Sequence, residues 1–466
     1  MTRAPTAHGR AAASRRPLAP LALAQFICSF AGSNMNVMIN DIGEDLDTTV
    51  QGVQGTITLF LLIMAVLMIP GSKLTDRWGR KRCFLAGLAL YGTGALISAF
   101  SPGLGVLILG NSVLEGVGTA LLIPPVYILA TMAYDDLPSR ARAFGVISGL
   151  GGVGAAAGPL IGGFIATAID WRAAFLFQAA VVVLIVFLSR RLVDPVAPDP
   201  ERPFDAAGAV LSAAGMFFVV FGILQADDDA ARMGMFLAAG AVLLAWFFLH
   251  IRSRERAGKE PLLSTGLFRN RTCNLGLVTQ NMQWLILMGT SFTVSVFLQT
   301  VRGYNAIETG VIFTAATVGA LVSSLAAERL ARRHSQKALI SAGFAMAVAG
   351  VAILLALVGA SSRVVAFTPG LLLIGLGVGV MLTPSVNVVQ SSFPEELQGE
   401  ISGLSRSVSN LGSSFGTAIV GTILVSGPAG GNRSYALAMV ALAVFALVGL
   451  AASVALPSGP KPPRSA

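Results

Sequence analysis

The sequence predicts an all-α membrane protein with about fourteen transmembrane helices, arranged as two six-helix bundles with two inserted linker helices. Only 12% of the 466 residues are charged and 54% are apolar, whereas a soluble domain carries roughly 25% charged residues. The mean hydropathy of +0.75 comes from separate apolar runs of about 20 residues, each long enough to cross a hydrocarbon core about 30 Å thick. A soluble fold of this size would lack the polar surface that keeps it dissolved.

Apolar runs bounded by charges, prolines and glycines place the helices along the chain. The predicted spans are residues 18–40, 53–72, 83–100, 104–132, 142–168, 172–190, 206–225, 233–251, 273–299, 307–327, 337–359, 364–391, 398–426 and 434–456. The first run follows four arginines, a layout that signal peptides share. We favour a spanning helix, because the run holds Asn34, Asn36 and Asn40, which suit a helix packed against other helices.

The positive charges alternate along the chain as the positive-inside rule predicts. With the N-terminus inside, 26 of the 32 lysines and arginines fall in the tails and cytoplasmic loops, and 5 fall in external loops. The remaining one, Arg406, lies within a predicted helix. The split predicts that both termini are cytoplasmic, and it explains the net charge of +9 without a nucleic-acid partner.

Several classes of function find no support in the sequence. Three isolated cysteines cannot form a full disulfide framework, and the three histidines have no metal-ligand spacing. The glycine-rich tracts lack the strand context of a nucleotide site, and no P-loop or nucleophilic triad is visible. We therefore expect no enzyme, no catalytic residues, no metal and no cofactor, and no ATP-driven transport.

An internal repeat predicts two related bundles. The tetrapeptide Ile-Ser-Gly-Leu at 147–150 recurs at 401–404, and the same offset of 254 residues aligns Gly158 with Gly412. Repeated bundles with a site at their interface are the architecture of secondary transporters. The predicted divisions are a tail at 1–17, a bundle at 18–192, a linker with two extra helices at 193–272, a bundle at 273–456 and a tail at 457–466.

A charged motif separates the second and third predicted helices. Residues 71–82 read Gly-Ser-Lys-Leu-Thr-Asp-Arg-Trp-Gly-Arg-Lys-Arg and resemble the signature loop of the major facilitator superfamily. The resemblance implies a gating latch built from Gly71, Asp76, Arg77, Gly79 and Arg80. Asp76 at a helix end can accept from free backbone N–H groups, or pair with a nearby arginine or with the other bundle. The alternative is that the five positive charges only hold the loop in the cytoplasm.

A second motif lies in the fifth predicted helix. Gly154, Gly158, Pro159, Gly162 and Gly163 are similar to the antiporter motif of exporting members of that superfamily. Glycines at i, i+4 and i+8 let a neighbouring helix pack backbone to backbone, and the proline permits a bend. With the two inserted helices, the whole chain resembles the fourteen-helix drug:proton antiporter family.

Glu115 is the acidic residue that lies deep in a predicted span. An ionised carboxylate there costs on the order of 3 kcal/mol on insertion scales, so it needs a use or a partner. We predict that it couples transport to protons; the alternative is a structural acid hydrogen-bonded to Asn111, one turn away, or to a neighbouring helix. The chain departs from the family pattern, with Ser112 and Glu115 where an arginine and a glutamine are usual, and Ala31 where an aspartate is usual.

Polar stripes predict which helices face the central cavity, although such stripes can also be hydrogen-bonding contacts between helices. Trp284 and Met288 add a soft apolar wall suited to greasy or aromatic ligands. The residues predicted to bind substrate are Gln25, Ser29, Ser33, Asn36, Asn111, Gln280, Trp284, Met288, Asn387 and Gln390.

The resemblance implies a proton-coupled secondary active exporter of amphipathic small molecules that works by alternating access. The expected partners are that substrate, protons and the lipid bilayer of a bacterial cytoplasmic membrane, and we expect a monomer. The alternatives are a dedicated exporter of one endogenous metabolite, antibiotic or lipid, and a membrane receptor that does not transport.

Overall fold

The computed structural model describes residues 18–134, 137–194, 197–201, 203–225, 230–331, 333–357, 364–394, 397–426 and 432–457. These ranges are almost entirely helical and contain no strand. Thirteen of their helices are long and apolar enough to cross a membrane. The predicted all-α membrane fold is confirmed.

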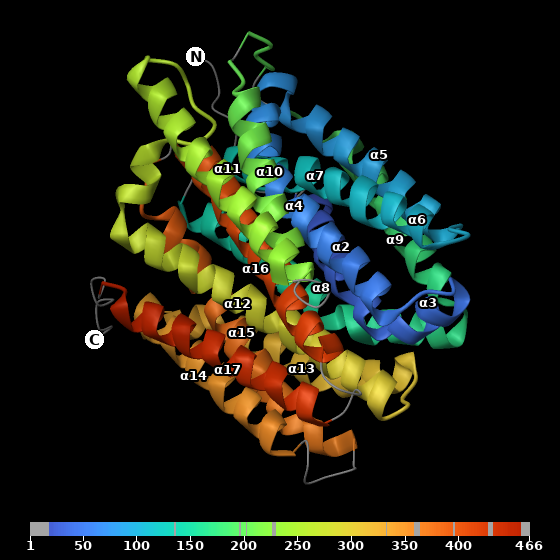
Figure 1. Cartoon of the computed structure of the whole chain (residues 1–466). Helices are drawn as coiled ribbons and strands as arrows, with labels where there is room; N and C mark the ends of the chain where they lie inside the picture. The colour runs from blue at the N-terminus through green and yellow to red at the C-terminus, as the bar shows by residue number, and fades with distance from the viewer. Residues whose placement is uncertain are drawn as a thin grey trace, which may run out of the picture.

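The helices of the first part of the chain pack beside one another and run from blue to teal in Figure 1. The long ones are α2 (Leu18–Asn34), α4 (Val50–Trp78), α5 (Arg80–Ala99), α7 (Gly116–Ala133), α8 (Leu137–Ala168) and α9 (Trp171–Leu188). The short ones are η1 (Met35–Val37), α3 (Ile39–Asp45), α6 (Leu104–Leu107), the π-helix η2 (Ile108–Glu115) and η3 (Ser189–Arg191).

The remaining helices form a hairpin and a second group. The hairpin is α10 (Ala206–Leu224) and α11 (Ala230–Arg256), followed by η4 (Thr265–Arg269). The second group contains α12 (Arg271–Val296), the π-helix η5 (Phe297–Val301), α13 (Ala306–Ala331), α14 (Gln336–Leu357), η6 (Val364–Phe367), α15 (Thr368–Gln390), α16 (Gln398–Ser426) and α17 (Asn432–Ala455).

Helix α16 is long but too polar to count among the thirteen apolar helices. It carries many serines together with Arg406 and Asn410. It packs between α4 and α12, which surround it with protein. Because its neighbours are helices rather than lipid, it can carry polar side chains at membrane depth.

The two groups repeat the same packing. Helix α2 lies against α8 as α12 lies against α16, and α5 pairs with α7 as α14 pairs with α15. Glycines allow the first kind of contact in both groups. A Cβ atom at Gly154 would lie 2.4 Å from the Phe26 carbonyl oxygen, and one at Gly412 would lie 2.3 Å from the Asn281 carbonyl oxygen. The repeat in the sequence therefore corresponds to a helix pair that occurs once in each group.

The groups meet along two helix pairs, α4 with α16 and α8 with α13. Along the first pair, the Ser414 hydroxyl donates to the Thr58 carbonyl at 3.2 Å and the Ser407 hydroxyl donates to the Ala65 carbonyl at 2.6 Å. Along the second, the Thr317 hydroxyl donates to the Ala156 carbonyl at 2.5 Å. Hydrogen bonds from the side chains of two serines and a threonine to backbone carbonyls thus link the two groups at membrane depth.

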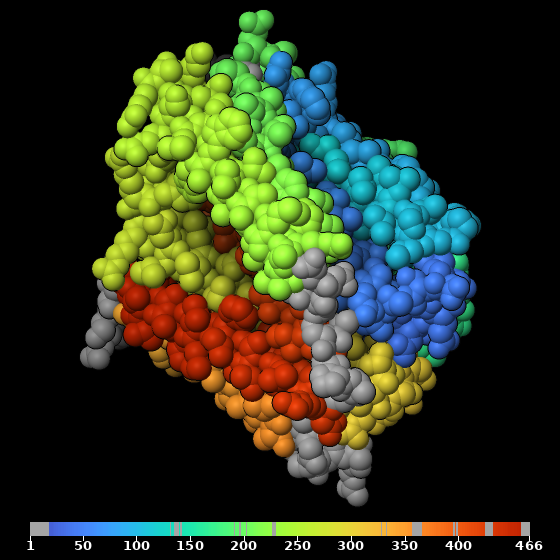
Figure 2. Space-filling model, viewed as in Figure 1, coloured from blue at the N-terminus to red at the C-terminus, as the bar shows by residue number. Residues whose placement is uncertain are grey.

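The α10–α11 hairpin packs on the outer face of α4 and α16, where Val220 contacts Leu62 and Ala418. Figure 2 shows this hairpin on the surface, with a hollow between it and α12 that α16 floors. Asp205 fastens the hairpin: its carboxylate accepts from the Gly208 N–H at 3.0 Å and lies 2.9 Å from His250 Nε2. Arg254 Nε lies 3.6 Å from the same carboxylate.

Side-chain caps explain where several helices begin. Thr49, Asp170 and Asn270 each accept a backbone N–H from the first turn of α4, α9 and α12. The charged segment 73–82 is not an extended loop, which corrects the predicted boundaries at 72 and 83. Helix α4 continues to Trp78 and α5 begins at Arg80, because Gly79 with φ of +93° reverses the chain in one residue.

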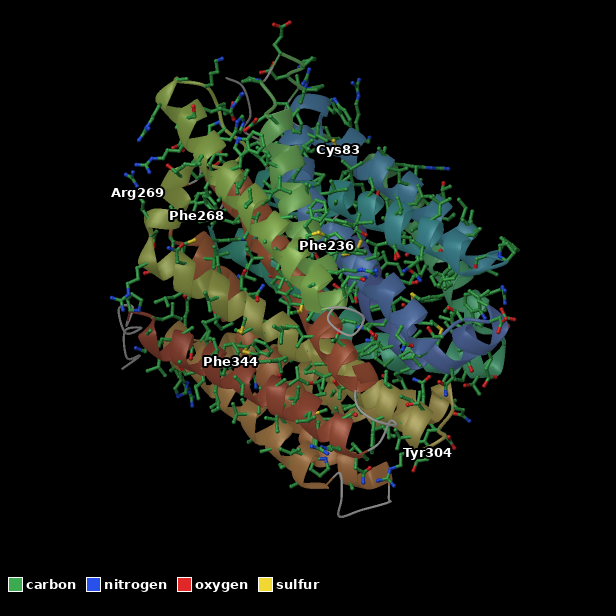
Figure 3. All side chains as sticks on the ribbon, viewed as in Figure 1. Cys83, Phe236, Phe268, Arg269, Tyr304 and Phe344 are labelled. Carbon is green, nitrogen blue, oxygen red and sulfur yellow. The ribbon has the colours of Figure 1, made fainter. Side chains whose placement is uncertain are left out.

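The two ends of the molecule differ in charge. We call the end with the segments 73–82, 252–271 and 329–337 the arginine-rich end. Cys83 and Arg269 mark it in Figure 3, and Tyr304 marks the opposite end.

Candidate functional site

A cavity with three connected compartments lies between the two helix groups. The polar compartment, of about 340 Å³, includes Gln25, Ser148, Gln280, Gln283, Ser385 and Arg406. The apolar compartment, of about 570 Å³, includes Ala155, Pro159, Leu287, Phe313, Ile374 and Val378. The methionine compartment, of about 490 Å³, includes Cys28, Ser29, Met64, Met68, Asn410 and Ser413. All three share Trp284, as predicted for a wall of the cavity.

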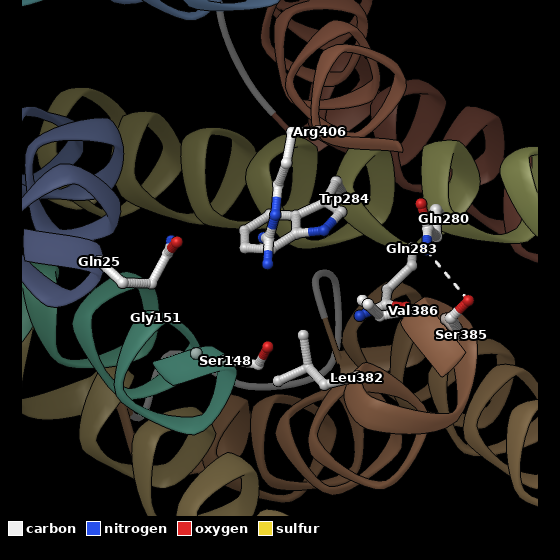
Figure 4. A pocket seen from close by; sticks show the side chains of 11 residues that line it. Gln25, Ser148, Gly151, Gln280, Gln283, Trp284, Leu382, Ser385, Val386 and Arg406 are labelled. Carbon is white, nitrogen blue, oxygen red and sulfur yellow. Dashed lines mark hydrogen bonds between the residues drawn. The ribbon is translucent and has the colours of Figure 1, made fainter. Parts of the chain in front are cut away.

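The polar compartment brings together side chains from five helices, α2, α8, α12, α15 and α16 (Figure 4). Gln280 on α12 is fixed in place, because its amide donates to the Ser385 carbonyl at 3.0 Å and accepts from the Ser405 hydroxyl at 2.7 Å. Gln283, one turn away, is 1% exposed and its Oε1 has no hydrogen-bond partner. The compartment thus holds one satisfied amide and one whose oxygen is free for a ligand.

Arg406 reaches into the same compartment from α16 (Figure 4). Its guanidinium donates to the Tyr127 hydroxyl on α7 and stacks 4.4 Å from the centre of that ring. The Tyr127 hydroxyl donates in turn to Gln25 Oε1 on α2 at 3.2 Å. The chain from Arg406 through Tyr127 to Gln25 therefore links the two helix groups across the cavity.

Arg406 was absent from the predicted substrate-binding residues, although it was identified as the one basic residue inside a predicted span. A charged side chain in a transmembrane helix points to a functional site by default. That signal could have found it; the pairing with Tyr127 has no signature in sequence spacing.

The apolar compartment lies between α8, α12, α13 and α15. Its α8 side is built from the small residues Gly152, Ala155, Ala156 and Pro159, so the compartment borders the predicted antiporter motif. Met288 lines both this compartment and the methionine compartment. Small side chains on one wall and flexible or aromatic ones on the others leave room for an apolar ligand.

The motif glycines place α8 between two partners. A Cβ atom at Gly158 would lie 2.0 Å from Ser33 Oγ, and one at Gly162 would lie 3.1 Å from Asn34 Cβ, so both face α2. A Cβ atom at Gly163 would lie 2.3 Å from the Ala306 carbonyl oxygen, at the start of α13. The motif therefore permits close packing within the first group and against the second.

Asn36 lies beyond the cavity, at the end of the molecule opposite the arginine-rich end, and lines none of the three compartments. Its side chain donates to Ser291 Oγ at 3.0 Å, and its carbonyl accepts from Gln299 Nε2 at 3.0 Å. Ser33 is also outside the compartments, because it packs against Gly158 and donates within its own helix. Of the predicted stripe on α2, only Gln25 and Ser29 line the cavity.

The arginine-rich end has its own links between the groups. The Ser72 hydroxyl donates to the Gly399 carbonyl at 3.0 Å, and Lys73 Nζ lies 2.9 Å from Glu400 and 3.0 Å from Glu260. Lys73 was not among the predicted gating residues, although it lies inside the predicted motif.

The five predicted gating residues lie around this contact. Asp76 pairs with Arg80 at 2.7 Å, and Arg77 is half-buried beside them. Gly71 packs against α7, since a Cβ atom there would lie 2.2 Å from the Ala120 carbonyl oxygen. Gly79 makes the reversal between α4 and α5.

Glu115 lies inside the first helix group and lines none of the three compartments. It is 0% exposed, and neither carboxyl oxygen has a hydrogen-bond partner of good geometry. It packs against α5, where a Cβ atom at Gly94 would lie 2.9 Å from Glu115 Cγ. The Tyr91 and Ser98 hydroxyls of α5 lie beside the carboxyl, and the Tyr91 hydroxyl donates to the Ile27 carbonyl at 3.2 Å or to Gln178.

Asn111 is a correction to the predicted cavity lining. It is 1% exposed, outside the three compartments, and its amide atoms have no partner. The hydrogen bond between Asn111 and Glu115, which was the alternative to a proton-coupling role, is not formed. The helix widens to a π-helix over Ile108–Glu115, which changes the faces expected from α-helical spacing.

The last two predicted substrate residues lie on α15 and line none of the three compartments. Asn387 is exposed, and the Gln390 amide lies 3.5 Å from Ser402 Oγ. Among the described residues, no group of three or more His, Cys, Asp or Glu side chains could hold a metal ion.

Comparisons with known proteins agree on one family. A family model described as Major Facilitator Superfamily matches residues 21–417. The multidrug resistance protein Stp of Mycobacterium tuberculosis is 26% identical over 398 residues, which cover 84% of this chain and 72% of that protein. The tetracenomycin C resistance and export protein of Streptomyces glaucescens is 30% identical over 404 residues, covering 83% and 71%.

Two further matches cover more of the chain. The multidrug efflux pump LfrA of Mycolicibacterium smegmatis is 28% identical over 410 residues, covering 88% of this chain and 80% of that protein. A solved structure of a POT family transporter has the same fold, with a TM-score of 0.68 and 16% identity over 95% of this chain and 97% of the other. The two repeated helix groups, the cavity between them and these matches show that this multi-pass membrane protein belongs to the Major Facilitator Superfamily.

Proposed function

We propose that the protein is a secondary active exporter that uses proton entry to drive efflux of amphipathic or lipophilic small molecules. The observation that carries this proposal is the cavity between the groups, in which a polar and an apolar compartment meet at Trp284. A ligand with one polar end and an apolar body would fill both at once. The names of the similar proteins, which include multidrug efflux and antibiotic export, support the same function.

Alternating access follows from the links at the two ends. Asn36, Ser291 and Gln299 join the groups at the arginine-poor end, whereas Ser72 and Lys73 join them to α16 at the other. Rocking one group against the other would break one set while the other holds. Both sets of links are formed in this structure, which supports a state in which the cavity is closed toward both ends.

Glu115 is the proposed site of proton coupling. A carboxyl buried away from water and without a cation beside it favours its neutral, protonated form. The group would carry its proton in this state and release it when rocking exposes it to water. A wall of α2 separates it from the cavity, and Cys28 on that wall lines the methionine compartment and lies close to Thr119. The Thr119 hydroxyl donates to the Glu115 carbonyl oxygen at 2.8 Å.

The setting we propose is a bacterial cytoplasmic membrane, with both termini in the cytoplasm and the chain acting as a monomer. The 26 to 5 division of basic residues supports this orientation. The energy source would be the proton gradient, with no cofactor, no covalent chemistry and no nucleic-acid partner.

The test is a flux assay on the full chain in proteoliposomes with an imposed proton gradient. We expect a lipophilic fluorescent dye to move against its own gradient only when protons move the opposite way. Protein-free vesicles and vesicles collapsed with a protonophore are the controls. Dye movement that ignores the proton gradient would reject the proton-driven antiporter.

A second candidate is a dedicated exporter of one compound, favoured by the similarity to the tetracenomycin C resistance and export protein. A thermal-shift panel of chemically diverse amphipathic compounds separates the two. Stabilisation by many scaffolds supports the multidrug exporter, and stabilisation by a single scaffold supports the dedicated one.

A further inference from the structure

We propose that the cavity selects amphipathic organic anions, with a carboxylate or phenolate at Arg406 and the apolar body in the apolar compartment. This inference names the substrate class and rests on the proposed function of the cavity as a transport site.

The first argument is uncompensated charge. Arg406 contacts the Tyr127 hydroxyl and ring, both of them neutral, and no described acidic side chain pairs with it. None of the residues that line the three compartments is an aspartate or a glutamate. An arginine cannot shed its proton in a protein, so the cavity carries a fixed positive charge.

The second argument is that unsatisfied polar groups surround this charge. Gln283 Oε1 and Ser385 Oγ both line the polar compartment, are each 1% exposed side chains, and have no hydrogen-bond partner. The Ser385 hydroxyl can donate a hydrogen bond to an oxyanion, as the guanidinium can, whereas the unpaired Gln283 oxygen can only accept one, from a hydroxyl or N–H group of the ligand. Charge-assisted hydrogen bonds of this kind are about twice as strong as neutral ones. The site therefore offers two donor groups, the guanidinium and the Ser385 hydroxyl, to one anionic group.

The third argument is the shape of the rest of the cavity. Trp284 stands between Arg406 and the apolar compartment, where Leu287, Phe313 and Val378 form apolar walls. A free inorganic anion would leave these walls bare, whereas a lipophilic cation would meet the charge of Arg406 at short range.

Binding of an anion would also act on the link between the groups. A carboxylate that takes the guanidinium replaces the bond to the Tyr127 hydroxyl, which joins α16 to α7. Release of Tyr127 frees one of the contacts that hold the cavity in this state. Substrate charge and conformational change would thus be coupled through one arginine.

The test measures binding to the purified full chain in lipid nanodiscs, with no transport required. Three probes share one apolar body: 1-pyrenebutyrate, 1-pyrenebutanol and pyrenebutyl-trimethylammonium. We expect the carboxylate to bind at least about tenfold more tightly than the alcohol, and the ammonium probe to bind most weakly. Equal binding of the three, or a preference for the ammonium, would overturn the inference.

Variants test whether Arg406 causes the preference for the carboxylate probe. Arg406→Gln should weaken carboxylate binding by about tenfold and change alcohol binding by less than about threefold, while Arg406→Lys should keep a reduced preference. Arg433→Gln, which removes an exposed arginine outside the three compartments, should change neither. An equal loss for carboxylate and alcohol in Arg406→Gln would show a structural role and reject the anion site.

Tyr127→Phe keeps the proposal testable if the arginine variants do not fold. It removes the hydroxyl that occupies the guanidinium, so carboxylate binding should hold or tighten. Weaker carboxylate binding in Tyr127→Phe would count against displacement. Because these are binding measurements, a failure of proton-driven flux would reject the proposed function and leave the anion preference to stand or fall on its own.

Discussion

Two ionisable side chains lie in transmembrane helices near the middle of the molecule, and their surroundings differ completely. Glu115 is sealed inside the first helix group with no partner for its carboxyl oxygens, whereas Arg406 lies in the cavity and stacks on Tyr127. A carboxyl can become neutral by taking a proton, but an arginine cannot become neutral by losing one. The acid therefore tolerates a dry interior, and the arginine has to remain where water or an anion reaches it.

In the proposed mechanism, the proton binds at Glu115 and the substrate binds in the cavity at Arg406, so the two sites are separate. Helix α2 separates them, with Gln25 and Ser29 on its cavity side. Proton and substrate would then be coupled through movement of helices rather than by competition for one carboxyl.

The largest expected effect concerns the acid. Glu115→Gln should reduce proton-driven flux to the level of protein-free vesicles, because the amide cannot exchange a proton. Stability should change by less than about 1 kcal/mol, since no hydrogen bond to the carboxyl is lost. Flux in proteoliposomes and unfolding in detergent measure the two quantities.

The matched variant is Glu115→Asp, which keeps an acid and should retain part of the flux. Binding of pyrenebutyrate to Glu115→Gln should remain within about threefold of the parent, because Arg406 is intact. Full proton-driven flux in a well-folded Glu115→Gln protein would mean that the acid does not couple transport.

Asp205 is a buried acid with charged partners, which Glu115 does not have. Burial raises the pKa of Asp205, but its hydrogen bonds with His250 and the Gly208 N–H and the nearby Arg254 outweigh burial, so its pKa lies below the ordinary value. Asp205→Ala should lower the free energy of unfolding by about 3 kcal/mol, because it removes the carboxylate that pairs with His250 and Arg254 and caps the first turn of α10. Chemical unfolding of the variant at neutral pH measures the loss.

The pH dependence of that contribution has a definite sign. A lowered pKa in the folded state means that the Asp205 contribution is fully present above the ordinary aspartate pKa of about 3.9 and is lost as the pH falls through the folded value. The stability difference between parent and Asp205→Ala should therefore stay constant from about pH 5 to 8 and shrink only in stronger acid. A difference that shrinks between pH 8 and 5 would contradict the pairing.

The wall between the two regions depends on the packing of α8 against α2. Gly158→Ala should destabilise the protein by about 1 to 3 kcal/mol, because the new methyl group would lie 2.0 Å from Ser33 Oγ. The control is Gly149→Ala in the same helix, which meets nothing within 4 Å and should be neutral or stabilise by up to about 1 kcal/mol. Thermal unfolding of both variants measures the contrast, and equal effects would show that the contact is not tight.

The fold could be predicted from the sequence because each apolar run had to be a helix in lipid. The face of a helix was harder to predict. Gln25, Ser29, Gln280, Trp284 and Met288 do line the cavity, as the polar and aromatic stripe indicated. The polar stripe on α2 continues past the cavity to a closed end, where the same kind of side chain joins the groups instead.

The errors have a physical cause in each case. Asn111 was misplaced because the π-helix turns its side chain relative to an α-helix. The pairings of Lys73 with Glu400 and of Arg406 with Tyr127 could not be predicted, because the partners lie far apart in the sequence. Contacts between the two groups are set by their docking, which no local pattern encodes.

The smallest expected effect lies at the far end of the helix that carries Arg406. Lys73 bridges Glu400 at the start of α16 and Glu260 in the linker, with its side chain 13% exposed. Partly exposed ion pairs contribute about 1 kcal/mol or less, which corresponds to about a fivefold shift between conformations. Lys73→Gln should therefore change the transport rate by about two- to fivefold and leave probe binding unchanged.

Variants of Glu400 and Glu260 test whether Lys73 links the two helix groups or is only a surface charge. If Lys73 holds the groups together, Glu400→Gln should reproduce the effect of Lys73→Gln, because Glu400 lies on the second group, and the double variant should add nothing further. Glu260→Gln should have less effect, because Glu260 follows the hairpin and does not belong to α16. Equal effects of the two glutamate variants would mean that Lys73 mainly holds the linker in place. The contact between Arg406 and Tyr127 would then be the one that controls the movement of α16.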